Sequence, residues 1–152
     1  MAGTRFQVKS YGADLVARHL RGLGRRADDL RPAWPAVAAQ AAAGYKRSFR
    51  AQGPGWAPLK PSTVRGRIAE GLPAGPILRR TDTFYRSATD PTRLVLLEGP
   101  HSLEIAVDDE VAEYHRDGTS RMVARPLKLS FGDRMNIVKV IDRKLHEGYF
   151  SK

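Results

Sequence analysis

The sequence predicts an α+β fold in one domain spanning residues 1–152. Long N-terminal helices are expected to pack on a small, mainly antiparallel sheet, followed by a C-terminal helix. Residues 33–50 carry apolar side chains at helical spacing, and two β-branched runs flank Gly99-Pro100-His101, which favours a hairpin. Residues 53–76 are dense in glycine and proline and predict an extended arm.

The N-terminal region predicts a short edge strand and a helix. Residues 6–11 alternate loosely between apolar and polar types, and residues 14–26 place their apolar side chains on one side of a helix. Asp28 or Asp29 is expected to cap the following helix, with Pro32 and Pro35 in its first turn.

Residues 33–50 give the clearest helical pattern. Its apolar stripe is formed by Trp34, Val37, Ala38, Ala41, Ala42, Tyr45 and Phe49. The small alanine side chains allow another backbone to approach closely, either within the subunit or across an interface.

Between residues 53 and 76, ten of 24 positions are glycine or proline. A short helix is expected from Ser62 to Glu70, capped by Ser62 or Thr63. Because compact domains rarely keep such a long loop without a use, we interpret it as an arm that orders on assembly. A disordered connection without function is the alternative.

The second half alternates short elements. Thr81 is expected to cap a helix that ends at Asp90-Pro91. Strands are expected at residues 93–98, 102–107 and 127–131, and a short helix at 109–115. Asp133 is expected to cap the final helix.

The net charge of +10 is unevenly distributed. Residues 1–90 hold 16 Lys and Arg against 6 Asp and Glu, whereas residues 91–152 hold 10 of each. This asymmetry suggests that a polyanion or an acidic protein surface faces the first part of the chain, and solubility is the alternative explanation.

No familiar catalytic, cofactor or metal constellation is visible in the sequence. Cysteine is absent, the four histidines lack metal-ligand spacing, and no nucleophile elbow or phosphate-binding glycine loop occurs. The run Asp108-Asp109-Glu110 is better explained by helix capping than by a metal. We therefore expect a protein that is not an enzyme and needs no cofactor. Neither a membrane span nor a secretory signal is expected.

Three clusters of residues stand out in order along the chain. The first is Gly55-Trp56-Ala57-Pro58-Leu59 with Thr63 downstream, the second is Ile77 to Ser87, and the third is Tyr114 to Gly118 followed by Ala124-Arg125-Pro126. Together they resemble the phage virion morphogenesis family, the tail-completion proteins typified by the G protein of phage Mu, and related neck proteins. That family's pattern is W-x-P-L, then I-L-x-x-T-G-x-L-x-x-S, a hairpin, Y-A-x-x-H-x-x-G and P-A-R-P.

The resemblance spans roughly residues 37–148, with departures. Asp82 stands where the family usually has glycine, Phe84 replaces the common leucine, and Val123-Ala124-Arg125-Pro126 replaces P-A-R-P. The resemblance implies a structural virion protein of a tailed bacteriophage, assembled in the host bacterial cytoplasm. Such a subunit would form an oligomeric ring at the head–tail junction or tail end and contact other neck, connector or tail proteins.

Nine residues are candidates for an interface or for non-specific contact with packaged DNA. They are Trp56, Lys60, Arg65, Arg67, Arg79, Arg80, Arg86, Tyr114 and Arg125. Trp56 equally fits an anchor in its own core, and Arg125 is expected to pair with carboxylates of residues 108–117. The alternative function is a small basic cytoplasmic protein that binds nucleic acid, which would show steep salt dependence.

Overall fold

The computed structural model describes residues 13–120 and 122–147. This part of the chain contains six α-helices, one 3-10 turn and a two-stranded antiparallel sheet, which confirms the expected α+β class. The elements are α1 (Ala13–Asp28), η1 (Arg31–Ala33), α2 (Trp34–Arg50), α3 (Pro61–Ala69), α4 (Thr83–Thr89), β1 (Leu94–Glu98), β2 (Leu103–Val107), α5 (Ala112–Asp117) and α6 (Phe131–His146). The expected edge strand at residues 6–11 lies outside the described residues.

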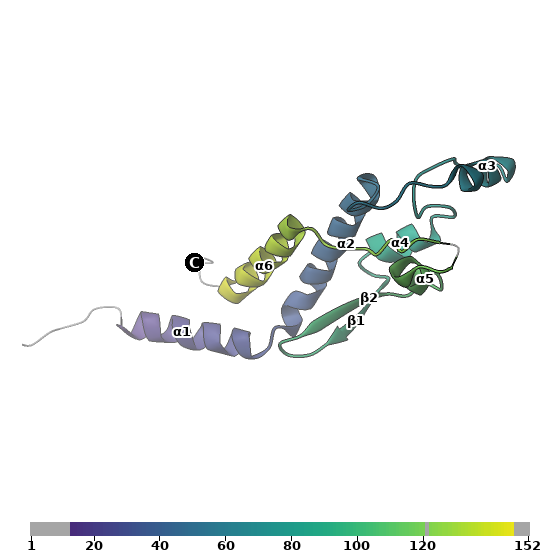
Figure 1. Ribbon diagram of the computed structural model, residues 1–152. Helices are drawn as coiled ribbons and strands as arrows, with labels where there is room; N and C mark the ends of the chain where they lie inside the picture. The colour runs from purple at the N-terminus through teal and green to yellow at the C-terminus, as the bar shows by residue number, and fades with distance from the viewer. Residues whose placement is uncertain (1–12, 121, 148–152) are drawn as a thin grey trace, which may run out of the picture.

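Helix α2 is the centre of the molecule. It runs between α6 on one side and α4 and the hairpin on the other (Figure 1). Ala38 and Ala42 are buried against Leu94 of β1, so the alanine face admits a neighbouring backbone within the subunit. On another part of the helix, a Cβ atom at Gly44 would lie 2.7 Å from Cδ2 of Leu129 and 3.1 Å from Cγ of Asp133, so α2 packs closely on the segment that leads into α6.

The expected hairpin is present and is formed by β1 and β2. Leu94 pairs with Val107 at one end and Glu98 with Leu103 at the other. Its turn lies against the start of α2, where Trp34 donates its indole N–H to the carbonyl of Gly99 at 2.9 Å. The sheet thus packs one face on α2 and leaves the other exposed.

The expected strand at residues 127–131 is wrong. Residues 122–130 form an irregular segment, and Phe131 already begins α6. This segment runs beside α2 and the start of the arm, where the carbonyls of Pro126 and Lys128 accept hydrogen bonds from the side chains of Trp56 and Ser48. These backbone carbonyls therefore bond to side chains and not to the backbone of a neighbouring strand, which a β-sheet would require.

Several helix starts also differ from expectation. Helix α3 begins at Pro61 after Lys60, without a side-chain cap from Ser62 or Thr63. Helix α4 follows Asp82 in a left-handed conformation instead of being capped by Thr81. In α6 the cap is Ser130, and Asp133 is its capping-box partner three residues later.

The arm, residues 53–76, contains α3 and otherwise consists of turns and irregular chain. It leaves the end of α2 and carries α3 outward from the body (Figure 1). At the opposite end α1 projects from the body, with its last turn tied to α6 by a hydrogen bond from Arg26 to the carbonyl of Leu145. None of the described helices has the length and apolar composition needed to cross a membrane.

Candidate functional site

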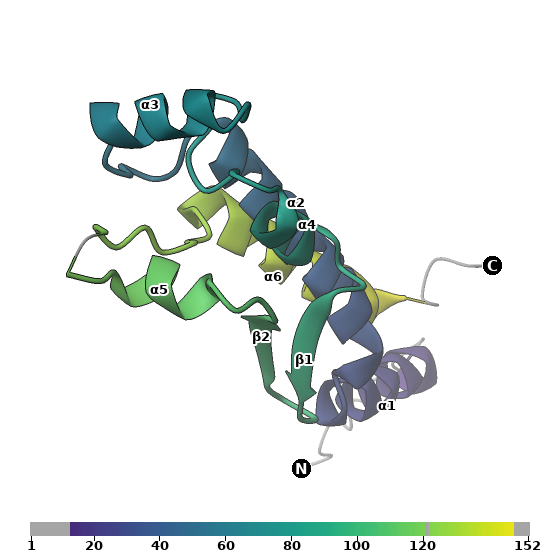
Figure 2. The same cartoon turned by 90° about the vertical axis from the view of Figure 1, so that its right-hand side faces the viewer.

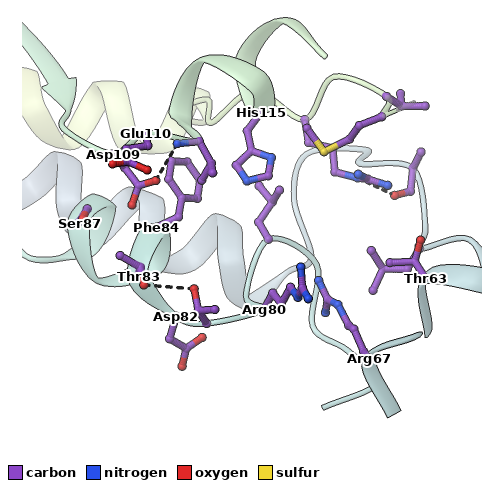
Figure 3. A pocket seen from close by; sticks show the side chains of 18 of the residues that line it. Thr63, Arg67, Arg80, Asp82, Thr83, Phe84, Ser87, Asp109, Glu110 and His115 are labelled. Carbon is purple, nitrogen blue, oxygen red and sulfur yellow. Dashed lines mark hydrogen bonds between the residues drawn. The ribbon is translucent and has the colours of Figure 1, made fainter. Parts of the chain in front are cut away.

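Helices α3 and α5 lie on the same side of α2, one above the other in Figure 2. A cavity of about 990 Å³ lies beside α3, α4, α5 and residues 122–125 (Figure 3). Its lining comes from four separate stretches, residues 57–67, 78–87, 108–115 and 122–125. All three sequence clusters contribute to it, although about 70 residues separate the first from the last. Sequence spacing gave no sign of this cavity, because only the fold brings the three together.

The core next to the cavity is built from the same clusters. Trp56, Ile77 and Phe84 pack together with Phe49 at the end of α2. The ring of Phe49 meets those of Trp56 and Phe84 edge-on, at centroid distances of 5.7 and 5.9 Å. This aromatic cluster holds the cavity wall in place.

Arg67 of α3 extends into the cavity although its side chain is buried, with 8% of the residue exposed. One Nη donates to the carbonyl of Pro76 at 2.9 Å, but Nε has no hydrogen-bond partner. Burial, together with the nearby charges of Arg80 and Arg125, lowers the pKa of Arg67. Arg67 and Arg80 turn toward one another in Figure 3.

Arg125 is buried to the same extent and connects the first cluster to the third. Its Nε donates to the carbonyl of Ala57 at 3.0 Å and its Nη2 to that of Pro58 at 3.3 Å. Its backbone N–H donates to the carbonyl of His115. The expected pairing with carboxylates of residues 108–117 is therefore wrong, since backbone carbonyls hold the guanidinium instead.

His115 points from α5 into the cavity (Figure 3) and packs on Phe84, with a ring-centroid distance of 4.9 Å. Its Nδ1 is buried without a partner. Burial, and secondly the charge of Arg125, lower the pKa of His115, which favours the neutral imidazole. The spacing of the histidines in the sequence gave no indication of this half-buried position.

The remaining candidates are divided between the cavity rim and other surfaces. Arg79 forms an ion pair with Asp82 at 2.8 Å and lies over the ring of Tyr85, while Arg80 pairs with Glu70. Lys60 lines the cavity and is exposed. Arg65, Arg86 and Tyr114 are exposed and do not line it.

Trp56 has its ring in the core, and its indole N–H donates to the carbonyl of Pro126. The core-anchor interpretation therefore accounts for this residue. Across residues 13–120 and 122–147, no group of three or more His, Asp or Glu side chains is arranged to hold a metal ion.

Comparisons of the chain with protein-family models, curated proteins and solved structures find no significant match. These comparisons therefore add nothing to the resemblance to tail-completion proteins.

Proposed function

We propose that this protein is a structural virion subunit of a tailed bacteriophage, a neck or tail-completion protein that works in an oligomeric ring. The observation that carries this proposal is an amphipathic N-terminal helix whose apolar side faces solvent. In α1, Leu15, Val16 and Leu20 are each more than half exposed. A partner that covers such a face recovers about 25 cal/mol for each Å² removed from water.

Helix α6 carries a second exposed apolar stripe. Phe131, Met135 and Val138 recur at helical spacing and are exposed, Phe131 at 72%. The opposite side of the same helix packs Ile137 and Ile141 on the core around Trp34. A ring held by head-to-tail contacts needs two different patches on each subunit, and the exposed sides of α1 and α6 supply two candidates.

Backbone geometry at two positions of the family pattern supports the resemblance. The pattern has glycine at the position of Asp82, and Asp82 has a φ of +59°, in the left-handed region that glycine occupies without strain. The glycine of H-x-x-G is Gly118, with a φ of +78°, where a Cβ atom would lie 2.8 Å from the backbone nitrogen of Ala124. Glycine in the pattern thus corresponds to a backbone requirement at both positions.

The basic segment of residues 46–86 is partly neutralised within the subunit. Arg47, Arg79 and Arg80 form ion pairs with Asp133, Asp82 and Glu70, and Arg67 is buried. Fewer cations are therefore presented to DNA than the sequence count suggests. This favours assembly over the alternative of a nucleic-acid-binding protein.

Electron microscopy and sedimentation of the purified chain test the assembly proposal. We expect rings or defined oligomers, and the double substitution Leu15→Gln with Leu20→Gln should shift them toward monomer without lowering the midpoint of unfolding. Leu97→Gln is the matched control, because Leu97 is an equally exposed leucine on the hairpin.

If the chain stays monomeric, never copurifies with virions and binds duplex DNA tightly with a steep salt dependence, nucleic-acid binding becomes the favoured function and the assembly proposal is wrong.

A further inference from the structure

The cavity beside α3 and α5 contains two buried cations that lack an acidic partner. Arg67 and Arg125 are each only 8% exposed. Within the described ranges 13–120 and 122–147, neither guanidinium forms an ion pair with a carboxylate. The hydrogen bonds of both side chains go to backbone carbonyls.

This arrangement is unfavourable as it stands. A buried charge is normally paired and fully hydrogen-bonded, because the desolvation of an ion is expensive. Here the two guanidinium groups repel each other and Arg80, and Nε of Arg67 donates to nothing. A guanidinium has five N–H donors in a planar fork, and its free edge matches the two oxygens of a carboxylate.

The walls around these cations are largely apolar. The aliphatic and aromatic lining residues include Pro58, Leu59, Leu78, Phe84, Met122 and Val123. The volume of about 990 Å³ is at the upper end of the range for small-ligand sites and accommodates a few residues of peptide. A suitable occupant therefore has apolar groups beside its negative charge.

Carboxylates are also part of the lining. Asp108, Asp109 and Glu110 precede α5, and Asp82 precedes α4. They disfavour a polyanion, and DNA phosphates on a stiff duplex contact exposed cations more readily than cations sunk in a cavity. A peptide with one carboxylate carries less negative charge than a polyanion, and its flexible chain can enter the cavity.

We propose that this cavity binds an acidic, partly apolar peptide segment of a partner protein, whose Glu or Asp carboxylate accepts from Nη2 of Arg67, the guanidinium nitrogen that is neither hydrogen-bonded to Pro76 nor buried. The carboxylate would also relieve the repulsion between Arg67 and Arg125. His115 lines the same cavity and packs on Phe84, so its ring adds to the wall beside the peptide. This interaction does not depend on the ring, since the exposed apolar sides of α1 and α6 are separate from the cavity lining.

Titration of the full-length ¹⁵N-labelled chain, followed at the arginine Nε–H resonances, tests the proposal. The probes are the capped tripeptides acetyl-Leu-Glu-Leu-amide and acetyl-Leu-Gln-Leu-amide, inorganic phosphate and a short DNA duplex. We expect the Glu peptide to shift the Arg67 resonance saturably and to bind about ten-fold more tightly than the Gln peptide, because a charge-assisted hydrogen bond is lost in the latter.

Arg67→Met should abolish this preference for the Glu peptide. Arg65→Met on the same helix is the matched control and should leave it unchanged, because Arg65 is exposed and outside the cavity lining. If Arg67→Met fails to fold, the titration of the unsubstituted protein decides. The absence of a saturable shift, equal binding of the two peptides, or tighter binding of phosphate or DNA would overturn the inference.

Discussion

The indole N–H of Trp56 donates to the carbonyl oxygen of Pro126 at a distance of 3.1 Å, across 70 positions of sequence. This contact joins the start of the arm to the segment that leads into α6. The ring itself is buried against Phe49. The start of the arm is therefore part of the core, although α3 projects from the body.

Two substitutions of Trp56 should separate the contribution of its hydrogen bond to stability from that of its buried ring. Trp56→Phe keeps most of the apolar ring and loses the hydrogen bond, so the free energy of unfolding should fall by about 1–2 kcal/mol. Trp56→Ala also leaves a cavity and should lower it by about 3–5 kcal/mol. Urea denaturation measures both, and equal losses in the two variants would show that the hydrogen bond, not the ring, stabilises the arm.

Gly53 and Gly55 form a matched pair for testing how Trp56 is seated. Both have positive φ, +85° and +78°, but a Cβ atom at Gly53 would lie 1.9 Å from the Trp56 ring whereas Gly55 has open space. Gly55→Ala should lower stability by about 1–2 kcal/mol through backbone strain alone. Gly53→Ala should lower it clearly further, and similar losses by thermal unfolding would contradict the packing of Trp56 against this turn.

Asp82 offers a test of the left-handed start of α4. Asp82→Ala removes the ion pair with Arg79 and places alanine at a φ of +59°, where a Cβ atom causes strain that no polar side chain offsets. The free energy of unfolding should therefore fall by about 1–2 kcal/mol. Asp82→Gly loses the same ion pair but removes the strain, and its stability should stay within about 1 kcal/mol of the unsubstituted protein. Chemical denaturation in which the glycine variant is the less stable of the two would exclude this explanation.

Asp133 should make stability depend on pH. Its hydrogen bonds from Ser130, and then its pairing with Arg47, hold the pKa of this buried carboxyl below the ordinary value of 3.8. A lowered folded-state pKa stabilises the protein above the unfolded-state value, and the stabilisation is lost as the pH falls through the folded-state value. Asp133→Asn should therefore cost about 1–3 kcal/mol near neutral pH, with a smaller difference below about pH 4.

Unfolding measured across this pH range checks the expectation for Asp133. Asp142→Asn is the control on the same helix, because Asp142 is exposed. A difference for Asp133→Asn that stays constant down to acidic pH would mean that its charge does not contribute.

Local patterns predicted the local elements well. The stripe from Trp34 to Phe49 gave α2, and the apolar runs on each side of Gly99-Pro100-His101 gave the hairpin. These succeeded because helical periodicity and strand alternation are set by neighbouring residues. The capping residues were less predictable, since Ser130 and Asp133 form a reciprocal pair in which either residue alone resembles a cap.

The sequence by itself determined the α+β class, the central alanine-rich helix, the hairpin and the unusual composition of residues 53–76. The tertiary structure alone decided that residues 122–130 are not a strand, that Arg125 binds backbone carbonyls of the arm, and that His115 lies in a cavity beside Arg67. Periodicity reports which side of an element is apolar, but it does not report which distant segment covers that side. Contacts between residues 50–70 positions apart depend on chain packing, so only the folded molecule shows that two buried arginines share one cavity and that neither forms an ion pair within the described residues.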